Sequence, residues 1–295
     1  MYRSEASVVE AIDCLLAQSY RDVAVVAVDD CSPDATYEVA LARFGEDPRV
    51  TVEANSSRLG LCANWNRVLT RAIELYPDCE LFAWASDNDI HDPTWLAEAV
   101  DALDRNPAAV LAFSRAGKFV HGRSVPARQR RLDDRAAAAR PIDRMCAVVG
   151  SSRDPGMVFG LLRVGPLRRV GGKPSLVAPD VLLLCHLSLY GEFARCPDYL
   201  FHLGKRRTGG TGRRQRAAVF AGRPPLWSYL PVQLQRLGWL TGQLVIGDRR
   251  PPGVGRLGAC GLIARFFVAD VRQEVAGIPV RIRKDSRRRA KERRG

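Results

Sequence analysis

Two groups of acidic residues follow short apolar runs and could do chemistry there. The acidic triplet Asp87-Asn88-Asp89 follows the apolar run Leu81–Ala85 after one serine, and Asp29 and Asp30 come directly after Val23–Val28. An ionised carboxylate near an apolar core must be solvated or paired, and Mg²⁺ or Mn²⁺ binds carboxylate oxygens while its remaining positions take waters and phosphates. The pattern therefore predicts a site for a divalent cation and a diphosphate. The alternative is that the acids cap the helices that follow them.

Apolar runs alternate with helical spacings along the first part of the chain. The run at residues 23–28 is apolar on both faces, which is typical of a parallel strand covered by helices, and further short strands are expected at residues 50–53, 81–85 and 109–113. Helical spacings fall between them, at residues 4–19, 35–44, 62–76 and 95–103. This alternation predicts a doubly wound α/β domain, in which ligands bind beyond the carboxyl ends of the strands.

The first helical spacing, at residues 4–19, has no strand before it. A βα unit without its first strand leaves a gap in the sheet, close to its centre. We expect an apolar segment upstream of Met1 to supply that strand. The alternatives are that the sequence is a fragment or a degraded copy of the domain.

The charge of the chain points to anionic partners. The formal net charge of the 295 residues is +13, and residues 281–294 hold nine Lys or Arg against two acids. Such an excess favours nucleotide phosphates or an anionic membrane surface. We expect no nucleic acid, because no platform of aromatic and basic residues accompanies the tail. The alternative for the tail is a solvated chain end.

The cysteines and the apolar stretches indicate the compartment. Eight cysteines are scattered without a C-x-x-C pair, which is typical of free thiols in a reducing compartment and argues against zinc. No apolar stretch is long and uncharged enough to span a bilayer. Leu226–Ile246 and Val254–Ala269 could instead lie flat on one. We therefore expect a cytoplasmic protein, with peripheral association at the inner face of the cell membrane as an option.

Four segments taken together resemble the family-2 glycosyltransferases, which are inverting enzymes of the GT-A fold that use nucleotide-sugar donors. They match the family in order and spacing over roughly residues 1–115, and they are Ala11–Tyr20 (AIDCLLAQSY), Val26–Asp34 (VAVDDCSPD), Asn55–Asn66 (NSSRLGLCANWN) and Trp84–Pro93 (WASDNDIHDP). Gly156–Leu189 is similar to the family's acceptor-side segment. The resemblance implies metal-assisted transfer of a sugar, with inversion, to a cell-envelope glycan or a lipid-linked acceptor.

The resemblance also implies roles for the donor-side residues. Asp30 would accept a hydrogen bond from the nucleotide base, with Asp29 beside it fixing the loop, and Arg58 would stack on the base or be a solvated arginine. Asn66 would hold the loop rather than touch the donor. Asp87 would contact the diphosphate, and Asp87 and Asp89 would bind the cation. Alignment on Pro93 places Asn88 where the family often has an aspartate, and its amide oxygen is an uncharged ligand.

On the acceptor side, the resemblance assigns the general base to Asp180, which precedes an apolar helical stretch and could alternatively cap it. His202 would be a further metal ligand or a diphosphate contact, although a lone histidine is more often structural. Arg206 and Arg207, beside a glycine-rich stretch, would belong to a flexible segment that closes on the diphosphate, or to a solvated charged loop.

The domain boundaries follow from composition. We expect a GT-A domain over residues 1–220, with a nucleotide-binding half at 1–115 and an acceptor half at 116–220. An amphipathic helical appendage is expected at 221–280 and a basic tail at 281–295. The appendage would bind a membrane surface or pack on the domain as a helical hairpin. A different functional class is also open, namely a catalytically degenerate GT-A domain that acts as a binding or scaffold protein.

Overall fold

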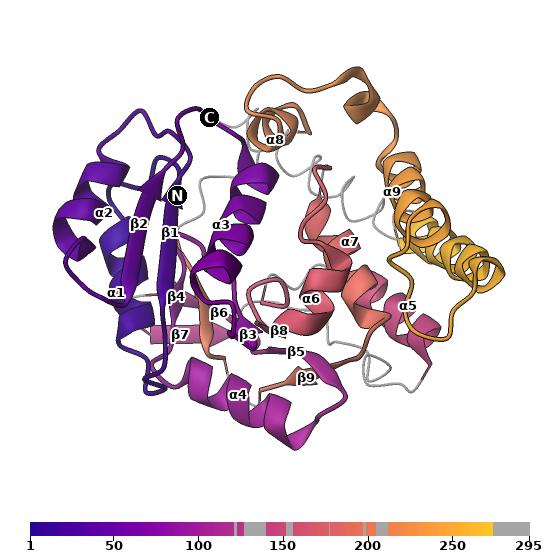
Figure 1. Cartoon of the computed structure of the whole chain (residues 1–295), viewed down its shortest axis with the longest axis horizontal. Helices are drawn as coiled ribbons and strands as arrows, with labels where there is room; N and C mark the ends of the chain where they lie inside the picture. Colours follow the sequence, from indigo (N-terminus) through magenta and orange to yellow (C-terminus); the bar gives the residue numbers. More distant parts are fainter. Residues whose placement is uncertain are drawn as a thin grey trace, which may run out of the picture.

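The structure is a computed structural model that describes residues 1–120, 123–126, 140–151, 156–176, 178–196, 199–204 and 212–273. It confirms the predicted α/β fold class, with helices packed around short strands (Figure 1). The predicted basic tail at 281–295 lies outside the described residues.

Helices and strands alternate over the first 113 residues, as the apolar pattern predicts. The elements are α1 (Val8–Leu16), β1 (Val25–Asp29), α2 (Thr36–Phe44), β2 (Val50–Ala54), α3 (Leu61–Leu75), β3 (Leu81–Phe82), β4 (Ile90–His91), α4 (Trp95–Arg105) and β5 (Ala109–Phe113). Several bounds differ from the expectation, and two of these differences bear on the site. Residues 4–7 form a turn before α1, because the Ser4 carbonyl accepts hydrogen bonds from the N–H groups of Ser7 and Val8. The third strand ends at Phe82 rather than Ala85.

The second half of the chain departs further from the sequence expectation. Its elements are β6 (Ala116–Val120), β7 (Arg123–Pro126), α5 (Pro141–Ser151), β8 (Leu161–Arg163), α6 (Val164–Val170), α7 (Pro179–Ser188), β9 (Glu192–Arg195), β10 (Phe201–Leu203) and α8 (Gly212–Val219). Strands β6 and β7, for which the sequence pattern predicts no strand, pair antiparallel. Helix α6 ends at Val170, where Gly171 closes it with a positive φ of 81°.

The strands form three sheets with mixed pairing. β1 and β2 pair in parallel as a two-stranded sheet, and the other two sheets have the orders β3-β8-β5-β9 and β4-β10-β6-β7. Within the described residues, no strand pairs with β1 on its other edge or joins it to β3. The sheet is therefore interrupted between β1, which ends at Asp29, and β3, which precedes the segment with Asp87 and Asp89.

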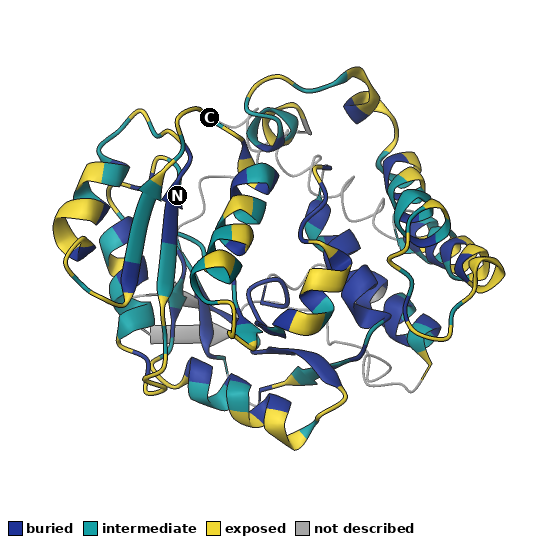
Figure 2. Ribbon diagram, in the orientation of Figure 1, coloured by how far each residue is buried: buried dark blue, intermediate teal, exposed yellow. Residues whose placement is uncertain are grey.

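The C-terminal helices share the core of the domain. Helix α9 (Val232–Thr241), the π-helical turn Gly242–Ile246 and the helix at residues 256–273 follow a short 3-10 turn at Leu226–Tyr229. Leu240, Ile263 and Phe266 are buried in the same cluster as residues of β5 and α7. A buried ion pair, Arg236 Nη1 to Asp270 Oδ1 at 2.6 Å, joins α9 to the last helix. The appendage therefore packs on the domain, with the buried residues of both parts facing each other (Figure 2).

Among the described helices, none is both long and apolar enough to cross a membrane. All eight cysteines are free thiols.

Candidate functional site

The two acids at the end of β1 hold two different loops. The carboxylate of Asp29 accepts hydrogen bonds from the backbone N–H of Ser32 at 2.7 Å and from its hydroxyl at 2.6 Å, which closes the turn after the strand. The carboxylate of Asp30 accepts from the backbone N–H groups of Leu59 at 2.7 Å and Gly60 at 2.9 Å. Both acids are buried. Asp30 therefore joins the strand end to the loop that leads into α3.

The same loop is fixed on its other side by α8. Gly60 has a φ of 91°, and a Cβ there would lie 2.5 Å from the carbonyl oxygen of Val219, the last residue of α8. The side-chain amide of Asn55 donates to Asp30 at 3.2 Å and to Asn64 at 2.8 Å. The loop therefore needs a residue without a side chain at position 60, a requirement that the sequence reasoning did not single out.

The acidic triplet lies under the first residues of the chain. The Asp87 carboxylate accepts hydrogen bonds from the backbone N–H of Tyr2 at 3.0 Å and from the Ser4 hydroxyl, both at Oδ2. The Ser7 hydroxyl donates to the Asp87 carbonyl at 2.8 Å. The amide oxygen of Asn88 accepts from the Ser86 hydroxyl at 2.8 Å. The N-terminal turn and the triplet therefore hold each other in place.

Asp89 ties the triplet to β10. Its buried carboxylate accepts from the backbone N–H of Gly204 at 2.8 Å, and a Cβ at Gly204 would lie 1.6 Å from the carbonyl oxygen of Asn88. His202 pairs with Ile90, the residue after Asp89, in the antiparallel β4–β10 ladder. Burial lowers the pKa of His202 and so favours its neutral form. Asp89 and His202 are thus neighbours along one strand pair.

The predicted metal ligands do not form a complete site from protein groups alone. Among the described residues, no group of three or more His, Cys, Asp or Glu side chains could hold a metal ion. The oxygens of Asp87 and Asp89 could hold a cation in the way that Mg²⁺ is often bound, by one or two carboxylates together with substrate phosphates and waters. Asp87 offers such an oxygen, because both of its described hydrogen bonds go to Oδ2.

Arg58 stacks on an aromatic ring of the protein. Its guanidinium carbon lies 4.2 Å from the ring centroid of Tyr2, and its buried Nε has no hydrogen-bond partner in the described part of the chain. The arrangement places a cation next to the residues that cover Asp87. Arg206 and Arg207 lie outside the described residues.

On the acceptor side, Asp180 is paired with a buried lysine. Asp180 is the second residue of α7 and does not cap it, since Ala178 occupies the N-cap position with a φ of 56°. Lys173 Nζ lies 3.0 Å from Asp180 Oδ1, and the side chain of Lys173 is 5% exposed while that of Asp180 is 46% exposed. Burial lowers the pKa of Lys173, while the carboxylate opposes that change. Lys173 therefore binds one carboxylate oxygen of Asp180, while the side chain of Asp180 remains partly exposed to solvent.

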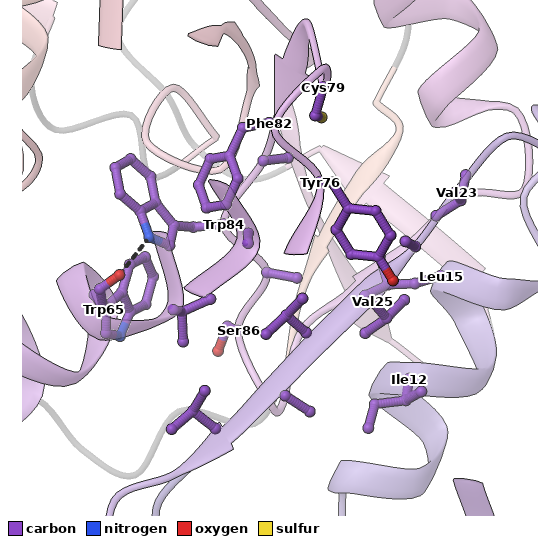
Figure 3. A pocket seen from close by; sticks show the side chains of 18 of the residues that line it. Ile12, Leu15, Val23, Val25, Trp65, Tyr76, Cys79, Phe82, Trp84 and Ser86 are labelled. Carbon is purple, nitrogen blue, oxygen red and sulfur yellow. Dashed lines mark hydrogen bonds between the residues drawn. The ribbon is translucent and has the colours of Figure 1, made fainter. Parts of the chain in front are cut away.

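The rings of Trp65 and Trp84 pack against the Lys173 ammonium and are called the Trp65–Trp84 floor below. The ammonium nitrogen of Lys173 lies 3.3 Å from the ring centroid of Trp65 and 5.2 Å from that of Trp84, and the Trp84 indole N–H donates to the Trp65 carbonyl at 3.0 Å (Figure 3). Trp65 belongs to α3, and Trp84 lies just before the triplet Asp87-Asn88-Asp89. Because both rings contact Lys173, which pairs with Asp180, the floor connects α3 and the triplet to Asp180. Sequence reasoning missed Lys173, Trp65 and Trp84.

Asn66 locks this arrangement to α3. Its side-chain amide donates to the Lys173 carbonyl at 2.8 Å, and its side-chain oxygen accepts from the Lys173 N–H at 2.8 Å. A Cβ at Gly172, whose φ is 84°, would lie 2.5 Å from the same oxygen. Asn66 therefore positions the Lys173 loop. The pair Gly171-Gly172 before Lys173 was the one signal in the sequence of a close backbone approach.

A family model described as glycosyl transferase family 2 matches residues 1–157, more than half of the chain. The chain belongs to glycosyltransferase family 2. Among solved structures it is similar to Staphylococcus aureus TarS 1–349 in complex with UDP-GlcNAc, with a TM-score of 0.60, 16% identity, and coverage of 91% of this chain and 70% of that chain.

A mannosyltransferase from Pyrobaculum calidifontis in complex with GDP-Man and Mn²⁺ matches with a TM-score of 0.50 and 18% identity, over 92% of this chain and 84% of that one. These similarities show the GT-A fold for this family-2 chain. A curated relative, the uncharacterized protein y4gI of Sinorhizobium fredii, is 31% identical over 121 residues, which is 40% of this chain. The chain spans 12% of the length of that relative.

Proposed function

We propose that this family-2 glycosyltransferase transfers a sugar, with inversion, from a nucleoside-diphosphate sugar to a hydroxyl of a cell-envelope glycan or lipid-linked acceptor. The observation that carries the proposal is the link between the two halves of the site. The triplet segment after β3 and the Lys173–Asp180 pair share the Trp65–Trp84 floor. Two structural neighbours contain UDP-GlcNAc and GDP-Man, which supports a nucleotide-sugar donor.

In the proposed reaction, Asp180 takes the proton of the acceptor hydroxyl. The oxygen attacks the anomeric carbon from the face opposite the diphosphate, and the bond between that carbon and the diphosphate oxygen breaks with its electron pair leaving on the diphosphate. The Lys173 ammonium holds one oxygen of Asp180, so the other can face the acceptor. Asp180 would thus be oriented before the acceptor arrives.

On the donor side, Asp29, Asp30 and Arg58 would bind the nucleoside. Asp30 already accepts from the loop, and its oxygens retain lone pairs for a base N–H. Asp87 would face the diphosphate, with Arg206 and Arg207 as further contacts. A divalent cation, Mg²⁺ or Mn²⁺, would be held by Asp87 and Asp89 with His202 as a further ligand, and it would stabilise the charge that develops on the leaving diphosphate.

The base assignment is tested by Asp180→Asn. We expect its turnover of donor and acceptor to fall by about 10²-fold or more, while donor affinity measured by calorimetry stays unchanged. Asp104→Asn, an exposed residue of α4, is the matched control and should retain full turnover. Wild-type turnover in Asp180→Asn would refute the assignment.

One observation favours a second candidate, a GT-A domain that binds without transferring. Asn88 stands at a position where the family often has an aspartate. Donor hydrolysis measured with Mn²⁺ separates the candidates. Donor binding without hydrolysis or transfer would favour the binding protein, whereas release of nucleoside diphosphate favours the enzyme.

A membrane-associated acceptor would suit the surface around α8. Leu226 is 90% exposed, and Trp227 and Tyr229 beside it are also exposed; interfacial aromatics favour the headgroup level of a bilayer. The neighbouring exposed arginines of α8, Arg213 and Arg214, would face anionic lipids. We therefore propose a cytoplasmic protein that binds the inner face of the cell membrane. Cosedimentation with anionic vesicles, compared with neutral ones, tests this.

A further inference from the structure

Arg249 links the C-terminal helices to the two helices on either side of Lys173. It lies between the π-helical turn Gly242–Ile246 and the helix at residues 256–273. Its backbone is bound at the end of α7, and its side chain is bound at the end of α6. Helices α6 and α7 pack against each other (Figure 1). Arg249 therefore contacts both elements that carry the acceptor side of the candidate site.

The backbone carbonyl of Arg249 is held by two side chains from the end of α7. Its oxygen lies 2.9 Å from His186 Nε2 and accepts a hydrogen bond from the Tyr190 hydroxyl, also at 2.9 Å. Burial lowers the pKa of His186 to about 4, so the ring is neutral, and a carbonyl partner requires its proton on Nε2. The Trp239 ring of α9 packs edge-on against this imidazole. These contacts hold the backbone at position 249 whatever side chain it carries.

The guanidinium of Arg249 caps α6. Its Nη1 donates to the Val170 carbonyl at 3.0 Å and to the Gln243 side-chain oxygen at 3.0 Å. Val170 is the last residue of α6, and carbonyls in the last turn of a helix have no partner within the helix. An arginine can satisfy them from outside. The cap of α6 thus comes from a residue about 80 positions further along the chain.

The two glycines after α6 are packed between Arg249 and Asn66. A Cβ at Gly171 would lie 2.1 Å from Nη1 of Arg249, and a Cβ at Gly172 would lie 2.5 Å from Oδ1 of Asn66. Both glycines have a positive φ, which a residue with a side chain rarely adopts. Lys173 follows directly. The C-terminal segment and α3 therefore fix the backbone that leads into Lys173 from two directions.

The connection from Arg249 to Asp180 consists of direct contacts. Lys173 Nζ lies 3.0 Å from Asp180 Oδ1, at the start of α7, and the end of α7 holds the Arg249 carbonyl. The loop between α6 and α7 is thus closed by an ion pair at one end of α7 and by Arg249 at the other. Loss of the guanidinium would free the end of α6 and, with it, the loop that carries Lys173.

We propose that Arg249 is a positioning residue for the acceptor side of the site. Its guanidinium sets the path of the chain from α6 into Lys173, and Lys173 in turn orients Asp180. The C-terminal helices are then part of the machinery that places the general base. The effect on turnover rests on the proposed function, whereas the placement of Lys173 by Arg249 does not depend on it.

The test uses three variants of the full chain. Arg249→Met removes the guanidinium but keeps the backbone carbonyl in place, and because Arg249 is exposed the change leaves no cavity in the core. Arg249→Lys is the rescue, since both side-chain hydrogen bonds come from the single nitrogen Nη1 and an ammonium has three donors. Arg250→Met is the matched control, because the described hydrogen bonds of Arg250 stay within residues 244–248.

The first readout is amide hydrogen exchange at Lys173, which involves no transfer reaction. The Lys173 N–H donates to the Asn66 side chain at 2.8 Å and makes no described contact with Arg249. We expect Arg249→Met to speed exchange at this amide by about tenfold, Arg249→Lys to restore most of the protection, and Arg250→Met to leave it unchanged. Wild-type exchange at Lys173 in Arg249→Met would overturn the proposal.

The second readout is turnover. We expect Arg249→Met to lower kcat by about fivefold at unchanged donor KM, with recovery in Arg249→Lys. The double variant with Lys173→Met should lose no more than Lys173→Met alone, because contacts in series are not additive. Additive losses, equal losses in Arg250→Met, or full turnover despite fast exchange would each overturn the proposal. Absence of any turnover in the wild type would instead refute the proposed function, and exchange at Lys173 would then decide the placement by Arg249.

Discussion

Replacement of Asp30 by alanine tests the link between β1 and the loop before α3. The carboxylate accepts two backbone hydrogen bonds, from Leu59 and from Gly60, and one from the Asn55 side chain. A hydrogen bond to a charged acceptor contributes about 1.5–3 kcal/mol. The Gly60 N–H is buried and loses its partner in full, whereas the Leu59 N–H is half-buried and water can reach it. We therefore expect Asp30→Ala to lower the free energy of unfolding by about 3 kcal/mol.

Urea unfolding followed by tryptophan fluorescence measures this change. Asp30→Asn keeps one acceptor oxygen and should lose about half as much, which provides an internal scale. Asp47→Ala is the matched control, because the Asp47 carboxylate also accepts from a backbone N–H, that of Arg49, but in an exposed hydrogen bond at the surface. Its loss should be much smaller. A loss below about 1 kcal/mol in Asp30→Ala would refute the reasoning, because the loop would then be held by other contacts.

Three further predictions follow from the buried groups around the site. Burial lowers the pKa of His91 to about 3, so between pH 6.5 and 3 the unfolded chain binds a proton that the folded chain does not. For this group the free energy of unfolding therefore falls by about 1.4 kcal/mol for each unit of decreasing pH. His91→Phe should reduce the pH dependence of the urea midpoint between pH 6 and 4, and an unchanged pH dependence would contradict the burial argument. Lys173→Met keeps the apolar part of the side chain and removes the ammonium that binds Asp180. Turnover should therefore fall about tenfold or more, while donor affinity and Tm stay unchanged. Full turnover would show that Asp180 needs no such partner. Gly204→Ala places a Cβ against the Asn88 carbonyl and should cost about 1–3 kcal/mol, whereas Gly238→Ala, with open space around it, should be neutral or stabilising in thermal unfolding.

The local part of the fold could be predicted from the sequence. Runs such as Val23–Val28 and Ala109–Phe113 are apolar on both faces, and they form β1 and β5 because helices cover them. The pairing of strands is a long-range property that periodicity does not report. The third strand ends at Phe82, because the edge of β3 that faces β1 has no described partner strand to extend it. Strands β6 and β7 were missed because both are short and carry a basic residue, Lys118 in β6 and Arg123 in β7.

The candidate site divides in the same way. Asp29 and Asp30 could be placed at the end of β1 from the apolar run before them, whereas Asp87 lies beyond the end of β3 at Phe82. Their partners could not be predicted, because Tyr2 and Leu59 reach them through turns. Lys173 was missed for the same reason: its contacts with Trp65 and Asp180 exist only once α3 and α7 are packed. The motif residues indicate where the site lies, and the tertiary contacts show how it is held.

Sugar transfer from a nucleoside-diphosphate donor is measured by the release of nucleoside diphosphate. The assay uses a panel of donors that includes UDP-GlcNAc and GDP-mannose, with Mn²⁺ or Mg²⁺ and with a chelator as the control, on the full chain. We expect release from at least one donor, and loss of that release in Asp180→Asn when an acceptor is supplied. No release and no binding of any donor would contradict the proposed function.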